Sequence, residues 1–167
     1  MTEPSGLFQW TDEYSVGVEE IDNQHRTLFE LINRLFMAAV NREHESAIPE
    51  ILAVLIDYTR THFSLEEELL ADVGYADLEA HHEEHLRFIE KMETVTRKYQ
   101  EGKVVTFELI NFLKRWLKEH ILETDQHYRS AIAGASIAAD NWATHAREVV
   151  AAKNRADPQR TWWKFWE

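Results

Sequence analysis

Residues 51–70 read ILAVLIDYTRTHFSLEEELL. Apolar side chains return every three or four residues along this stretch, which is the spacing of one face of an α-helix. His62 and Glu66, four residues apart, continue that apolar face. A polar group on such a face has to be hydrogen-bonded or bound to a metal ion. The segment therefore predicts a helix, capped at its start by Ser46, that turns two candidate metal ligands inward.

Three further segments show the same helical periodicity, and each also carries histidine on its apolar face. The four predicted helices run from Glu19 to the polar stretch 41–45, from Ser46 to Gly74, from a capping Asp77 to about Tyr99, and from about Phe107 to about Ala131. Four amphipathic helices with short connections predict an all-α fold, an up-down-up-down four-helix bundle. A fifth helical stretch, about residues 136–154, and an aromatic tail follow the bundle.

The composition excludes several classes of protein. The net charge of −12 lacks the basic footprint of nucleic-acid binding. The absence of cysteine excludes disulfides and thiolate ligands. No apolar run reaches the length of a membrane span, and residues 1–10 do not resemble a secretory signal. We therefore expect a cytoplasmic protein.

Five histidines lie on the inward faces of the four predicted helices. They are His25, His62, His81, His85 and His120. A single histidine on an apolar face is usually a core residue, but five of them, together with Glu66, indicate a metal site. Imidazole suits zinc, copper, nickel and iron, and added carboxylates favour iron or manganese. Three other histidines, His44, His82 and His145, are expected to lie in solvent.

In the fourth predicted helix, spacing does not settle which residue accompanies His120 as a ligand. On a regular helix, Asp125 is rotated by about 140° from the direction of His120, whereas His127 returns almost to the same face. Spacing alone therefore favours His127 or Thr124 over Asp125.

A resemblance to a known family covers the chain from about Leu7 to Tyr128. The motifs that carry it are F8-x-W10, Y14-x-V16-G17, I21-D22-x-Q24-H25, H62-F63-x-x-E66-E67, H81-x-x-x-H85-x-x-F88 and W116-L117-x-x-H120-I121-x-x-x-D125-x-x-Y128. Together they resemble the hemerythrin family, specifically the single-domain bacterial hemerythrins. The resemblance implies a four-helix bundle around a non-haem di-iron centre that binds O2 reversibly.

The resemblance also implies a ligand set. One iron would be held by three histidines and the other by two, with two carboxylates and an oxo or hydroxo group bridging them. The residues are, in that order, His81, His85 and His120; His25 and His62; Glu66 and Asp125. These ligands fill about eleven of about twelve octahedral positions, so the iron with two histidines keeps one position open for O2. Trp116 and Leu117 are implied as the lining of the ligand pocket.

The choice of Asp125 requires a distorted helix. A spacing of five residues can turn both His120 and Asp125 inward only where the helix is widened, as in a π-type turn. We predict such a turn between these two residues. A regular α-helix with His127 in the cavity would contradict the assignment.

The implied function is storage or transport of O2, or its delivery to a partner enzyme, without catalysis. Two alternatives are an oxygen or redox sensor and a di-iron enzyme acting on nitric oxide or peroxide. A structural zinc site fits less well, because seven ligands exceed the four of a closed zinc site. Hydrogen-bond acceptors around the ligating rings are expected, but their identity is left open.

The C-terminal part of the chain falls outside this resemblance. We divide the chain into a di-iron bundle, residues 1–131, and an extension, residues 132–167. The extension holds five large aromatic residues, which are Trp142, Trp162, Trp163, Phe165 and Trp166. The favoured interpretation is that they pack against the bundle or a second copy. The alternative is that they dock a partner protein or a membrane surface.

Overall fold

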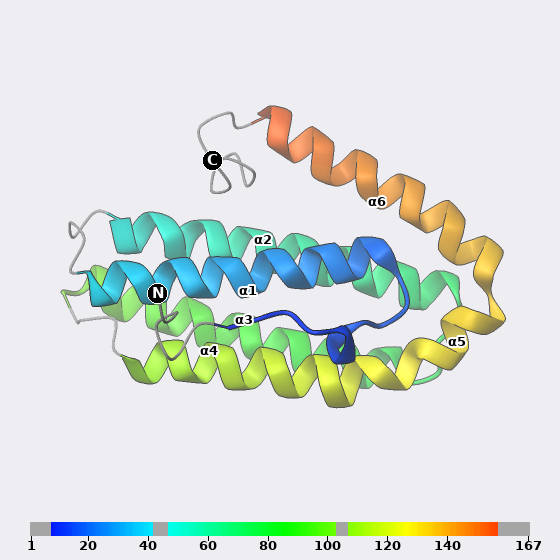
Figure 1. The fold of residues 1–167 in the computed structure, drawn as a ribbon, viewed down its shortest axis with the longest axis horizontal. Helices are drawn as coiled ribbons and strands as arrows, with labels where there is room; N and C mark the ends of the chain where they lie inside the picture. Colours follow the sequence, from blue (N-terminus) through cyan, green and yellow to red (C-terminus); the bar gives the residue numbers. More distant parts are fainter. Residues whose placement is uncertain (1–7, 42–46, 103–106, 157–167) are drawn as a thin grey trace.

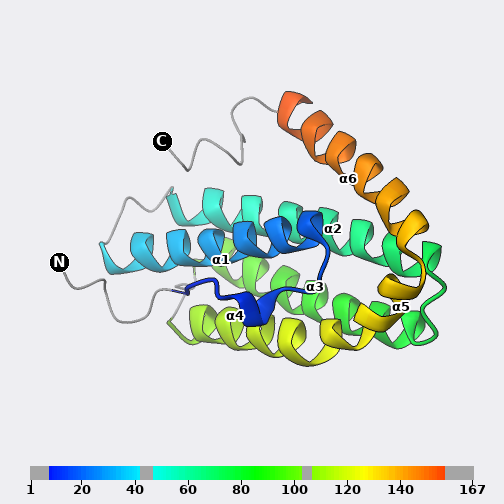
Figure 2. The same cartoon turned by 45° about the vertical axis from the view of Figure 1, so that its right-hand side comes forward.

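The computed structural model describes residues 8–41, 47–102 and 107–156, and these residues form an all-helical fold with no strand. Four helices lie side by side as a bundle and alternate in direction (Figures 1 and 2). They are α1 (Glu19–Val40), α2 (Ala47–Asp72), α3 (Leu78–Gln100) and α4 (Phe107–Glu119). Helix α1 packs against α2 and α4, and α2 packs against α3. The prediction of an all-α bundle is confirmed.

The end of α2 shows why the chain can reverse there. Gly74 has a φ of 69°, the left-handed conformation that glycine adopts without steric cost. Its N–H donates to the carbonyl of Ala71, and the N–H of Tyr75 donates to the carbonyl of Leu70. This pair of bonds is the Schellman motif, which satisfies the last carbonyls of a helix.

The structure tests only one of the two predicted capping residues. Asp77 does stand at the N-cap of α3, but its side chain makes no capping hydrogen bond, so this part of the prediction is wrong. Its backbone, at φ −98° and ψ 23°, is not in the extended conformation from which a capping side chain reaches back. Ser46 lies outside the described residues.

The fourth helix is not uniform. After α4 the chain forms a π-helical turn, η2 (His120–Thr124), then a 3-10 turn, η3 (Asp125–Tyr128), and then α5 (Arg129–Gly134). The continuous helix expected to about Ala131 is thus broken into four pieces. The π turn predicted between His120 and Asp125 is confirmed.

The predicted fifth helix is also present, as α6 (Ser136–Ala156). It turns back from α5 and packs against α2 and α1 (Figure 1). A short 3-10 turn, η1 (Asp12–Tyr14), precedes α1. The aromatic residues from Trp162 onwards lie outside the described part of the chain.

The buried apolar side chains form two clusters. The first contains Phe29, Leu55 and Phe63 and fills the interior of the bundle, with members from α1, α2, α3 and α4. The second contains Ile21 and Leu69 from the bundle and extends to α5 and α6. The predicted ligands lie near the boundary between these two clusters.

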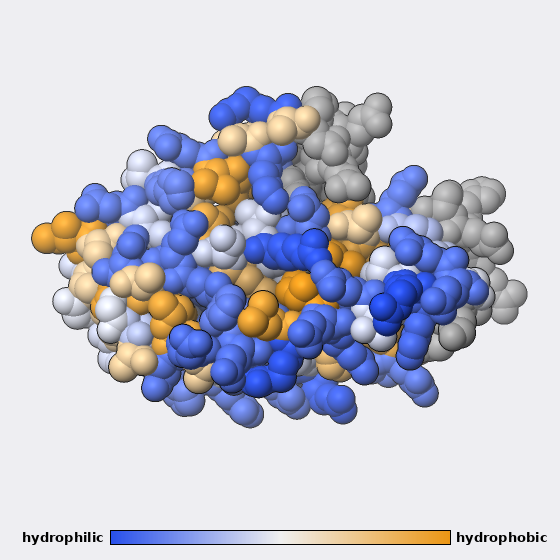
Figure 3. Space-filling view, turned by 180° about the vertical axis from the view of Figure 1, so that it is seen from behind, coloured by the Kyte–Doolittle hydropathy of each residue, from blue (hydrophilic) through white to orange (hydrophobic). Residues whose placement is uncertain are grey.

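On the face shown in Figure 3 the surface is mainly polar, and apolar side chains form only small patches. In the described part of the chain, no helix is long and apolar enough to cross a membrane.

Candidate metal centre

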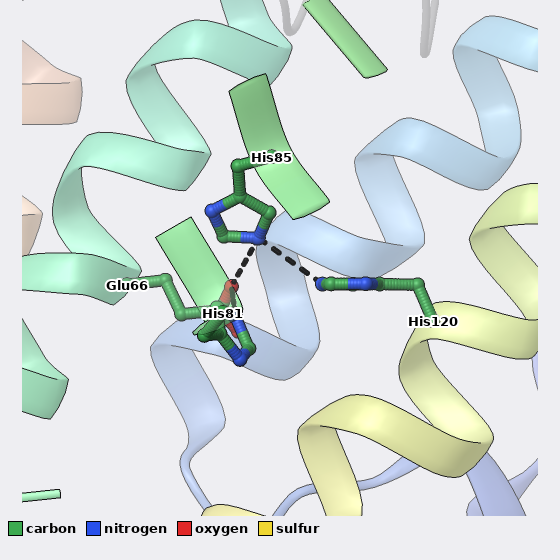
Figure 4. Close-up of side chains that lie close together, drawn as sticks. All are labelled: Glu66, His81, His85 and His120. Atoms are coloured by element: carbon green, nitrogen blue, oxygen red, sulfur yellow. Dashed lines mark hydrogen bonds and ion pairs between the residues drawn. The ribbon is translucent and has the colours of Figure 1, made fainter. Parts of the chain in front are cut away.

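All seven predicted ligand residues are buried, and none exposes more than 4% of its surface. They come from every helix of the bundle: His25 from α1, His62 and Glu66 from α2, His81 and His85 from α3, and His120 and Asp125 from the irregular segment after α4. Figure 4 shows four of them, Glu66, His81, His85 and His120, converging from three sides. The fold therefore brings the predicted residues together in the interior.

The donor atoms fall into two groups. One contains Glu66, His81, His85 and His120, and the other contains His25, His62 and Glu66. Within each group these atoms lie within 4.8 Å of one another. Glu66 belongs to both groups, so a single carboxylate stands between three histidines and two.

Glu66 presents one oxygen to the rings. Its Oε2 lies 3.1 Å from Nε2 of His81, 3.3 Å from Nε2 of His85 and 4.0 Å from Nε2 of His62. The other oxygen, Oε1, accepts a 2.6 Å hydrogen bond from the hydroxyl of Tyr128.

Asp125 faces both groups as well. Its Oδ1 lies 3.1 Å from Nε2 of His120 and 3.6 Å from Nε2 of His81. Its Oδ2 lies 3.4 Å from Nε2 of His25. The widened η2 turn is what places this carboxylate between the rings, because a regular helix would rotate it away.

Several buried polar atoms at this place have no hydrogen-bond partner among the residues that the structure describes. They are both nitrogens of His25, Nε2 of His62, Nδ1 of His81 and both oxygens of Asp125. Buried polar groups without a partner are costly, and a cluster of them needs a physical reason. Imidazole nitrogens and carboxylate oxygens in this proportion fit a pair of iron ions.

Hydrogen bonds outside the cluster orient three of the rings. Nδ1 of His62 lies 2.7 Å from Oε1 of Gln24, Nδ1 of His85 lies 2.8 Å from Oε1 of Glu67, and Nδ1 of His120 lies 3.1 Å from Oε2 of Glu84. Because these oxygens can only accept, the ring Nδ1–H donates. In the neutral form of each ring the lone pair of Nε2 then faces the interior, as ligation requires.

Sequence analysis did not identify these acceptors. The acceptors Gln24 and Glu67, and also Tyr128, the donor to Glu66, stand inside the motifs quoted above, which is a usable signal. Glu84 had no signal, because its contact with His120 spans 36 residues.

The two imidazole rings of the two-histidine group are neutral at pH 7. Burial lowers the pKa of His62 to about 4 and lowers the pKa of His25 well below its ordinary value of 6.5. Neutral imidazole is the form that binds metal.

His120 differs from these two rings. Burial lowers its pKa, but the negative charge of the adjacent Asp125 and a hydrogen bond with Glu84 outweigh burial and raise it to about 10. Without a cation the carboxylates thus hold a proton on this ring, and a metal ion would displace it.

The sequence pattern of the hemerythrin HHE cation binding domain matches residues 16–132. The chain belongs to the hemerythrin family. It is therefore one of a family of non-haem iron proteins that bind O2.

Individual hemerythrin relatives support the assignment to this family. The chain is 38% identical to a bacteriohemerythrin of Clostridium acetobutylicum over 128 residues, which cover 73% of this chain and 98% of the relative. It is 40% identical to a bacteriohemerythrin of Pseudomonas aeruginosa over 123 residues, 74% of this chain and 80% of the relative. A crystal structure of wild-type hemerythrin superposes with a TM-score of 0.71 at 33% identity, covering 75% of this chain and 98% of that one.

The remaining histidines of this hemerythrin chain lie apart from the cluster. His127 and His145 are exposed, while His82 is half-exposed with its Nδ1 2.9 Å from Oε2 of Glu67. His44 lies outside the described residues. Asp125, rather than His127 or Thr124, is the residue that faces the cluster, with its oxygens near the rings of His25, His81 and His120. The hydroxyl of Thr124 instead donates to Oε2 of Glu84 at 3.0 Å.

The two predicted pocket residues of the hemerythrin site adjoin the cluster in different ways. The ring of Trp116 stacks on the ring of His120, with centroids 4.5 Å apart and planes at 12°. Leu117 is buried in the same apolar cluster as Ile121 and Phe63. Their contact with bound O2 stays a prediction.

Proposed function

We propose that this hemerythrin binds O2 reversibly at a di-iron centre, for storage, transport or delivery to a partner enzyme. One iron would be held by three histidines and the other by two, with two carboxylates shared between them. The proposed ligands are, in that order, His81, His85 and His120; His25 and His62; Glu66 and Asp125.

One observation carries the proposal: the buried donor atoms divide into a three-histidine group and a two-histidine group that share Glu66. Asp125 supports the same division, because one of its oxygens faces His81 and His120 while the other faces His25. A single metal ion would not use two such groups. When bound, the iron pair supplies the position for O2 and the electrons that hold it.

The protein's own contribution is to orient neutral ligands and to exclude water. Five imidazoles and only two carboxylates give the site little negative charge. Iron enzymes that oxidise substrates in four-helix bundles use mostly glutamate. Fewer anionic ligands stabilise high-valent iron less, which favours release of O2 unchanged. Apolar neighbours such as Leu117, Ile121 and Phe63, all buried, keep water from the cluster.

The proposal is tested on iron-loaded protein. The protein is reduced without oxygen, exposed to O2 and then returned to an oxygen-free atmosphere while its visible absorption is followed. A charge-transfer band that appears with O2 and fades on its removal, over several cycles, is the expected result. Rapid irreversible oxidation, or turnover with nitric oxide or peroxide, would contradict a carrier and favour an enzyme.

A further inference from the structure

Helix α6 lies beyond the family match, which ends at residue 132, yet it reaches the turn of α2 that carries Glu66. Trp142 of α6 is buried, with 2% of its surface exposed. Its indole Nε1–H donates a 2.7 Å hydrogen bond to the carbonyl of Leu65, a residue 77 positions earlier. Since Leu65 precedes Glu66, α6 is bonded to the helical turn that presents the shared carboxylate.

The Trp142 bond uses a carbonyl lone pair of α2 that the helix itself does not need. A helical carbonyl accepts one N–H from the next turn and keeps a second lone pair. The indole takes that lone pair at Leu65, so α2 keeps its helical bonds while gaining an anchor. Trp142 also belongs to the same buried cluster as Tyr128, whose hydroxyl donates to Glu66.

A pocket shared by α6 and Gln24 lies beside the two-histidine group. Helices α6 and α1 border a cavity of about 310 Å³ whose wall includes Gln24, Tyr58, Val150 and Asn154. Gln24 is 5% exposed and accepts the bond that orients His62. Helix α6 and Gln24 therefore line the same pocket beside the Gln24–His62 pair, and α6 packs against both α1 and α2.

We propose that α6 is a positioning element of the metal centre and that Trp142 is its positioning residue. The helix holds the Leu65–Glu66 turn through Trp142 and walls the pocket that Gln24 lines beside His62. The inference rests on the proposed function only in assigning Glu66 and His62 as ligands. It predicts that α6 docking and metal binding stabilise each other, because such coupling is reciprocal.

The first test is the full-length variant Trp142→Phe, which keeps an aromatic ring but removes the N–H donor. The metal-free protein is titrated with Co2+, and the visible bands of bound cobalt give both affinity and ligand geometry. Removing a direct partner of a ligand weakens metal binding about 10–100-fold. Because Trp142 acts one residue away, we expect about 3–10-fold weaker binding and shifted cobalt bands.

Ile51→Val is the matched control. It removes one methyl group from a core residue of α2 outside the segment that α6 contacts through Leu65, and Ile51 is only 4% exposed. The control is expected to lower the midpoint of urea unfolding without changing cobalt affinity or bands. If Trp142→Phe behaves like this control, its role is merely structural and the inference is overturned.

The second test uses unaltered protein, so it does not depend on a variant that folds. Hydrogen exchange of the α6 backbone amides is compared with and without bound Zn2+. Slower exchange in α6 on zinc binding, by about 3–10-fold to match the coupling expected above, supports the inference. Exchange that slows in α1–α4 but not in α6 overturns it.

Failure of this inference can be told apart from failure of the proposed function. Wild-type protein that binds no metal overturns both. Wild-type protein that binds two cobalt ions, with no effect of Trp142→Phe and no protection of α6, overturns the inference alone.

Discussion

At the scale of single residues, the cluster is organised by partners that bind no metal themselves. Gln24 and Glu84 turn the Nε2 atoms of His62 and His120 inward by accepting from Nδ1. Tyr128 fixes one oxygen of Glu66 and leaves the other to face the rings. These outer bonds are made by buried or half-buried groups, so each should affect metal binding without touching the metal.

The variant Gln24→Leu is expected to weaken metal binding at the two-histidine group. It removes the acceptor of His62 and leaves a buried N–H unpaired, which costs about 1–3 kcal/mol. Loss of such a partner lowers metal affinity about 10–100-fold. Cobalt titration of the metal-free variant measures the effect.

Gln126→Leu is the control for this change. Gln126 bonds the carbonyls of Ser15 and Ile121 rather than a ring. Equal loss of metal affinity in the two variants would show that Gln24 has no special role.

The metal-free protein should lose stability in acid because of His62. Its pKa is about 4 in the folded protein, against an ordinary 6.5. As the pH falls from 6.5 towards 4, the unfolded chain takes up this proton first, so the free energy of unfolding decreases. The decrease is on the order of 3 kcal/mol for a shift of this size.

Urea unfolding at pH 7 and pH 4 measures this loss. In His62→Leu the difference between the two pH values should shrink, since the group that titrates is gone. An unchanged difference would show that other groups carry the acid sensitivity. In iron-loaded protein the same protons compete with the metal, so acid should also release iron.

At the scale of elements, the η2 turn decides which side chain faces the rings. A π turn is equivalent to one residue inserted into an α-helix, and it lets residues five apart share a face. His120 and Asp125 are so spaced, and both are buried, whereas His127 is exposed.

Two changes of chain length test the turn. Deleting the exposed Glu123 leaves His120 and Asp125 four apart, which a regular helix also turns inward, so two metal ions should still bind. Inserting an alanine after Glu123 makes the spacing six and rotates the carboxylate away. That insertion should weaken metal binding by more than about 10-fold, the low end of what losing an outer partner costs.

The readout for both changes is cobalt stoichiometry, with far-ultraviolet circular dichroism as a check on helix content. Equal binding by the insertion and deletion variants would mean that Asp125 is not a ligand.

At the scale of the whole molecule, metal binding and folding should be coupled. The unpaired nitrogens and oxygens of the cluster lie inside the bundle, where the described residues give them no hydrogen-bond partner. A bound cation satisfies these atoms in the folded state only, so it stabilises the fold by mass action.

Removing the metal should therefore lower the melting temperature by about 10 °C. A ligand present at 1,000 times its Kd contributes about 4 kcal/mol, and in a chain of this size each kcal/mol shifts the melting temperature by about 2–4 °C. Calorimetry of iron-loaded and chelator-treated protein measures the shift. Identical melting temperatures would indicate that the cluster does not hold metal under those conditions.

The sequence alone determined the helices and which histidines face inward, because the repeat of about 3.6 residues is a local property. It predicted the bundle, the fifth helix and five buried histidines. It could not choose Asp125 over His127 by spacing. The family motifs made that choice, and the π turn supplies its geometry.

Only the tertiary structure decided the contacts between distant segments. His62 meets Gln24 across 38 residues, His120 meets Glu84 across 36, and Trp142 meets Leu65 across 77. No periodicity encodes such pairs, because they depend on how each helix is rotated and where it crosses its neighbours. The same packing places α6 beside Gln24 and against the turn of α2 that carries Glu66, a position that the pattern of residues 132–167 did not reveal.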